Sequence, residues 1–72
     1  MSNIEYMNEC MARDLITMLM EDQGMEMEDA IDTLYNSETY AKLKDPDTGL
    51  YFQSAVYVYD YLKQEITTGK LA

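Results

Sequence analysis

Cys10 is the side chain best suited to nucleophilic chemistry, because it is the single cysteine of the 72-residue chain. Cys–His and Ser–His mechanisms need a neighbouring base, and the sequence contains no histidine. We therefore expect Cys10 to act as a small buried hydrophobe on or beside a helix stripe. A lone thiol without histidine also excludes an intrachain disulfide and a Cys/His metal site.

Paired carboxylates are the other chemistry that the composition offers. Fourteen acids in 72 residues produce close pairs by chance, and acid–base catalysis also needs a cleft. Asp45-x-Asp47-x-Gly49 is superficially similar to a calcium loop, but Gly49, Leu50 and Val56 stand where an EF-hand needs an oxygen ligand, glycine and glutamate. The prediction is a protein that is not an enzyme, with no catalytic, cofactor-binding or metal-binding residue.

The acidic side chains are concentrated in the first half of the chain. Residues 1–38 hold ten acids and one base, whereas residues 39–72 hold four of each. The negative potential of these acids repels phosphate backbones and attracts a basic protein surface, so we expect a protein partner and no nucleic acid. The candidate partner-binding acids, which also fit a merely solvated face, are Glu21, Asp22, Glu26, Glu28, Asp29 and Asp32.

Tyrosine and methionine are both abundant, with seven of each and no tryptophan. Both pack well in cores, and both are enriched in protein interfaces. On a helix, Tyr57, Tyr59 and Tyr61 span about 400° of arc, so some of them must face solvent or a partner. Tyr57 and Tyr59 complete the candidate partner-binding residues, and the methionines at 18, 20, 25 and 27, beside the acids, suit a basic amphipathic helix.

These side chains need helices to position them. Apolar residues recur at helical spacing over residues 4–22, with Ser2 or Asn3 as the cap and Gly24 beyond the end. Ile16 and Met20 fall outside that stripe, which indicates a helix central to the fold or packed on another chain. A second helix is predicted over about 27–35, and its predicted buried face comprises Met27, Ala30, Ile31, Leu34 and Tyr35.

The second half of the chain predicts two more helices. Ser37 caps a short helix that runs through Leu43, and residues 45–49 form a turn. Residues 50–62 are rich in strand-favouring side chains, but no other segment would pair with a strand. We therefore predict a helix over about 55–67, capped by Ser54, and keep a strand paired across chains as the alternative. The fold class is all-α, a single domain over 1–72 formed by a small irregular bundle of about four helices.

The location of the chain is expected to be cytoplasmic. No basic segment precedes Arg13, so the sequence lacks the pattern of a signal peptide. No window reaches the length of uncharged apolar residues that a membrane span needs. A single cysteine is typical of a reducing compartment.

A spaced pattern in the second half carries a family resemblance. It reads Tyr35-Asn36-Ser37-x-Thr39-Tyr40-x-x-Leu43-x-Asp45-x-x-Thr48-Gly49-Leu50-Tyr51-x-x-Ser54-x-x-Tyr57. This pattern resembles a family of short bacterial proteins, the domain of unknown function numbered 3791. Those sequences have proline after the serine, where this chain has Ala55. The resemblance implies an all-helical fold without assigned activity, and an association with toxin–antitoxin-like systems in which a protein partner is natural.

Together these observations predict a protein–protein interaction module, with a homodimer among its expected assemblies. The alternative is an acidic mimic that occupies the basic site of a nucleic-acid-binding protein through the acids from Glu21 to Asp32. Salt separates the two interpretations, because a complex that is insensitive to salt depends on apolar docking.

Overall fold

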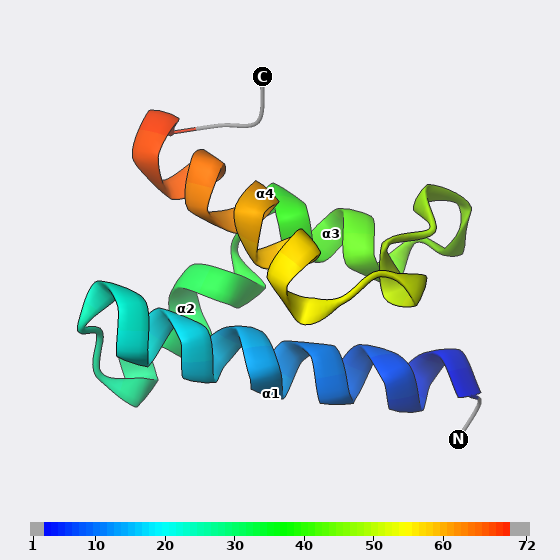
Figure 1. Cartoon of the computed structure of the whole chain (residues 1–72), viewed down its shortest axis with the longest axis horizontal. Helices are drawn as coiled ribbons and strands as arrows, with labels where there is room; N and C mark the ends of the chain where they lie inside the picture. The colour runs from blue at the N-terminus through cyan, green and yellow to red at the C-terminus, as the bar shows by residue number, and fades with distance from the viewer. Residues whose placement is uncertain (1–2, 70–72) are drawn as a thin grey trace.

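The computed structural model describes residues 3–69, and within them the chain forms four α-helices (Figure 1). Between α3 and α4 lie two single turns of 3-10 helix, and no strand occurs in these residues. The all-α prediction is confirmed, and the alternative of a strand in residues 50–62 is wrong. The proposed Ser2 cap lies outside the described residues. The elements are α1 Asn3–Gln23, α2 Met27–Tyr35, α3 Glu38–Lys44, η1 Pro46–Thr48, η2 Leu50–Phe52 and α4 Ala55–Thr68.

Helix α1 is the platform on which the other elements pack. It runs the length of one side of the bundle, α2 folds back against it, and α3 and α4 lie on the same side of it as α2 (Figure 1). The buried side chains form one cluster to which every α-helix contributes. Those with no exposed surface include Leu15, Leu19, Leu34, Leu43, Val58 and Leu62. The stripe predicted for residues 4–22 therefore faces the core, except near its start, where Met7 is exposed.

The predicted buried face of α2 is only partly right. Ala30 and Leu34 are fully buried, but Met27 is 57% exposed and Tyr35 is 50% exposed. Helix α2 contacts chiefly α1 and α3, so one narrow row of its side chains is enough to fill the contact. Met27, Ile31 and Tyr35 form the adjacent row, at steps of four residues, and lie at the edge of that contact.

The helix starts follow the predicted capping. The Ser37 side chain accepts a hydrogen bond from the Tyr40 backbone N–H at 3.0 Å, and Ser54 accepts one from the Tyr57 N–H at 3.1 Å. Each bond satisfies one of the backbone donors left without a partner in the first turn of a helix. These local contacts define where α3 and α4 begin.

A second, non-local cap joins α4 to the start of α3. The Glu65 carboxylate accepts hydrogen bonds from the Glu38 N–H at 2.8 Å and the Thr39 N–H at 3.0 Å. It also accepts one from the Thr39 hydroxyl at 2.8 Å, and Thr39 is fully buried. The carboxylate therefore satisfies two further backbone N–H groups that have no partner within α3. Its negative charge also interacts favourably with the positive end of the helix dipole.

Gly24→Ala is expected to lower the free energy of unfolding by about 1–2 kcal/mol, because an L side chain disfavours the left-handed conformation. Gly24 ends α1 with φ +67°, and an added Cβ would meet nothing within 4 Å. The cost is therefore one of backbone conformation alone. Chemical denaturation measures it, and Gly24→Asn is the matched control because asparagine tolerates this conformation better. An equal loss in both variants would contradict the explanation.

Candidate partner-binding site

An apolar groove lies between α1 and α2. Its volume is about 420 Å³. The side chains that line it are mainly apolar, and they include the row of α2 side chains that lies at the edge of the core. From α1 come Ala12, Ile16 and Met20, and from α2 come Met27, Ile31 and Tyr35. The off-stripe positions Ile16 and Met20 thus have an explanation within one chain, because they form one wall of this groove.

Helix α3 and a few polar residues of α1 complete the groove. Tyr40 of α3 lines it, and the Tyr40 and Tyr35 rings lie with their centroids 4.8 Å apart. The Lys44 ammonium stands 5.0 Å from the centre of the Tyr40 ring. Burial raises the pKa of Tyr40 above its ordinary 10.0, and nearby Tyr35 and Glu9 raise it further. Tyr40 therefore remains a neutral hydrogen-bonding group at physiological pH.

Charged residues stand at the edges of the groove. Glu9 and Arg13 line it from α1, and they carry opposite charges. On α2, Glu28 and Asp32 are exposed and follow Met27 and Ile31 in sequence, about 100° further round the helix and away from the core. Neither residue lines the groove, but both lie on the exposed face of α2 beside it. This face, which we call the α2 edge of the groove, is acidic, and α2 contains no base to offset it.

The predicted acidic residues do not share one face. Glu21, Asp22, Glu26, Glu28, Asp29 and Asp32 are all exposed. Helical geometry directs Glu28 and Asp32 to the groove side of α2, while Asp29 lies further round. Asp22 lies elsewhere, at the contact between α1 and α4, and the structure therefore divides the acidic block instead of gathering it into one patch.

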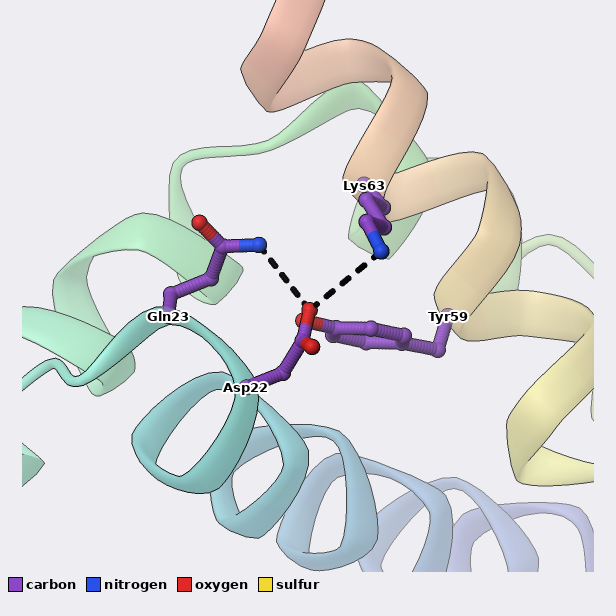
Figure 2. Close-up of polar contacts among 4 residues, drawn as sticks. All are labelled: Asp22, Gln23, Tyr59 and Lys63. Atoms are coloured by element: carbon purple, nitrogen blue, oxygen red, sulfur yellow. Dashed lines mark hydrogen bonds and ion pairs between the residues drawn. The ribbon is translucent and has the colours of Figure 1, made fainter.

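Asp22 accepts hydrogen bonds at the contact of α1 with α4 (Figure 2). The Tyr59 hydroxyl donates to its carboxylate at 2.7 Å and the Gln23 amide at 3.0 Å, while the Lys63 ammonium lies 3.6 Å away. Tyr59 is only 6% exposed and belongs to the core cluster. The prediction that Tyr59 offers its ring to a partner is therefore corrected, because that ring packs inside the bundle and its hydroxyl joins two helices.

The contact changes the proton affinity of both partners. The hydrogen bond from Tyr59, helped by Gln23 and Lys63, lowers the pKa of Asp22 below its ordinary 3.8. Burial raises the pKa of Tyr59 above 10.0, and its hydrogen bond to Asp22 raises it further. The contact therefore requires an ionised Asp22 and a protonated Tyr59.

Tyr59→Phe is expected to remove a pH-dependent part of the stability. The stability that the ionised Asp22 contributes is present above its unfolded pKa of about 4, and it is lost as pH falls through the lowered pKa of the folded state. The stability that the protonated Tyr59 contributes is present below about pH 10, and it is lost as pH rises through the raised pKa of the folded state. The advantage of wild type over Tyr59→Phe should therefore be largest between these limits and shrink at both ends, as urea melts across pH would measure.

Tyr57→Phe provides the control for that series. The Tyr57 hydroxyl pairs with that of Tyr61 at 3.2 Å, and this hydrogen bond raises the pKa of Tyr57. Removing this hydrogen bond should change the stability only at alkaline pH, because no carboxylate takes part in the Tyr57–Tyr61 pair. An advantage of wild type over Tyr59→Phe that does not vary with pH would contradict the assigned linkage.

The remaining tyrosines of α4 agree with the helical-arc argument. Tyr57 is 45% exposed and Tyr61 is also exposed, while Tyr59 is buried. Tyr57 lies outside the α1–α2 groove, in a shallow depression with Tyr61, Asp60 and Gln64. The structure therefore does not bring Tyr57 together with the acids of α2.

The chemistry-bearing residues of the sequence are scattered. Cys10 is only partly buried, so its prediction as a small buried hydrophobe is only partly right. Within residues 3–69, no three acidic or cysteine side chains come together in a way that would hold a metal ion. None of the helices in that range combines the length and apolar character that crossing a membrane requires.

Sequence reasoning missed the groove and the Glu65 cap. The off-stripe Ile16 and Met20 were the signal for the groove, but its other wall was assigned to the core. No local signal marks Glu65, since its partners lie 26 and 27 residues away. No family model, curated protein or solved structure matches the chain, so the resemblance to the domain of unknown function numbered 3791 stays a prediction.

Proposed function

We propose that this chain is a non-catalytic protein-interaction module that binds a protein partner in the α1–α2 groove. The observation that carries the proposal is the exposure of Met27 and Tyr35 beside the half-buried Ile31. Covering apolar surface is worth about 25 cal/mol per Å² before the costs of association. Methionine and tyrosine are also the side chains enriched where proteins meet.

The charge of the chain supports a basic protein as that partner and makes nucleic acid an unfavourable one. The net charge is −9, and the α2 edge of the groove is acidic. We place the interaction in the bacterial cytoplasm, following the family resemblance and the single cysteine. A toxin–antitoxin-like system is the setting that the same resemblance suggests.

Affinity capture from the native host tests the proposal when wild type is compared with matched variants. Met27→Ser and Ile31→Ser alter the groove, whereas Val56→Ser alters an exposed apolar residue of α4 outside it. The expected result is a discrete protein retained by wild type and Val56→Ser and lost with the two groove variants. Equal retention by all four proteins, each folded by circular dichroism, would reject the groove as the binding site.

Salt separates this proposal from the acidic-mimic alternative. Apolar docking should keep a substantial part of the affinity when salt screens the acids, because burial of apolar surface does not depend on ionic strength. A mimic of a phosphate backbone would lose almost all of it. The engagement of Asp22 with Tyr59 and Lys63 in the same chain supports docking over mimicry.

A further inference from the structure

We infer that the groove takes a basic amphipathic helix, which rests on the proposed function and specifies its partner. Two independent features of the groove carry this inference: its apolar length and the sign of the charge along its α2 edge.

The length of the groove suits a helix. Its α1 wall extends from Glu9 to Met20, which is about 16 Å along the axis, or three turns. A partner helix of three turns presents apolar anchors at steps of three and four residues, the usual pattern of helix-in-groove recognition. Met20 and Met27 line the groove, and their flexible, unbranched side chains can adapt to the shape of those anchors.

The negative charge of the α2 edge favours a partner helix that carries basic residues beside its apolar stripe. Glu28 and Asp32 are exposed one position beyond the groove residues Met27 and Ile31. Lysine or arginine beside the apolar stripe of a bound helix would face these carboxylates. Complementary charges of this kind steer association and exclude partners of the wrong sign.

The same charges disfavour a second copy of this chain as the occupant. Each copy carries a net charge of −9, and α2 contains three acids and no base. Docking one acidic chain in the groove of another would bring like charges together at the rim. The expected homodimer is thus the weaker assembly, and it becomes one outcome of the test.

Two synthetic helices of about 18 residues provide the probes. They share one leucine stripe, and their flanking positions carry lysine in one peptide and glutamate in the other. NMR titration of the isotope-labelled full chain measures the affinity and locates the site. We expect the lysine peptide to shift the signals of Ile16, Met27 and Ile31 and to bind about tenfold tighter than the glutamate peptide at low salt. The ratio should fall towards one in high salt.

Charge-reversal variants locate the effect. Glu28→Lys/Asp32→Lys should abolish or reverse the preference for the lysine peptide. The matched control is Asp47→Lys/Asp60→Lys, which changes the net charge equally. Asp47 and Asp60 are exposed and belong to η1 and α4, neither of which lines the groove. The control should keep most of the preference, because its changes lie away from the groove.

The outcomes distinguish the inference from the proposed function. Equal binding of both peptides in the groove would overturn the basic helix and leave the interaction module standing. A groove-dependent partner captured from the host, with neither peptide binding, would do the same. A doubled mass in light scattering, with groove signals that shift on dilution, would overturn the basic helix in favour of a second copy. Equal loss of preference in both charge variants would overturn the assignment to Glu28 and Asp32.

Discussion

Leu15→Ala is expected to lower the free energy of unfolding by about 3–5 kcal/mol. Leu15 lies in the middle of α1 and has no exposed surface. Truncating it removes apolar contacts and leaves a cavity in the one cluster that α1, α2, α3 and α4 share. A domain of this size has a net stability of only about 3–5 kcal/mol, so most of the variant should be unfolded at room temperature.

Circular dichroism during urea titration measures this loss, and Met7→Ala is its matched control. Met7 belongs to the same predicted stripe of α1 but is exposed, so its truncation should change stability by less than about 1 kcal/mol. Similar losses in the two variants would mean that the core is not centred on Leu15.

Features that depend on neighbouring residues were predictable from the sequence. Apolar spacing gave four helices, and Ser37 and Ser54 marked two of their starts, since a serine side chain reaches the backbone three residues later. Residues 50–62 favour a strand by propensity, but no other segment of the chain could pair with one, and this correctly predicted a helix over about 55–67.

Features that depend on tertiary contacts were not predictable in the same way. An apolar stripe on α2 shows that one side is buried, but not how wide the contact is, so Met27 and Tyr35 were placed in the core. Tyr59 was expected at the surface because three tyrosines cannot all face inward. The helical arc requires some of them to face outward, but it does not show which of the three packs inside.

Glu65→Ala is expected to lower the free energy of unfolding by about 2–3 kcal/mol, since it removes hydrogen bonds to a charged acceptor. Two backbone donors of α3 and the Thr39 hydroxyl would lose their partner. The hydroxyl belongs to a fully buried residue, so water does not easily replace the carboxylate there. The loss should appear in urea titrations as a lower midpoint with little change in slope.

Two further variants separate the cap from general packing. Glu65→Gln keeps one acceptor oxygen but loses the charge, so it should cost about half as much as the alanine variant. Thr39→Val removes only the hydroxyl contact, and a double-mutant cycle with Glu65→Ala, which leaves no acceptor, should give a coupling of about 1 kcal/mol. A coupling near zero would mean that the hydrogen bond between the two side chains contributes nothing. In that case the two backbone hydrogen bonds to Glu65 and the packing of Leu43, Val58 and Leu62 would hold α3 against α4.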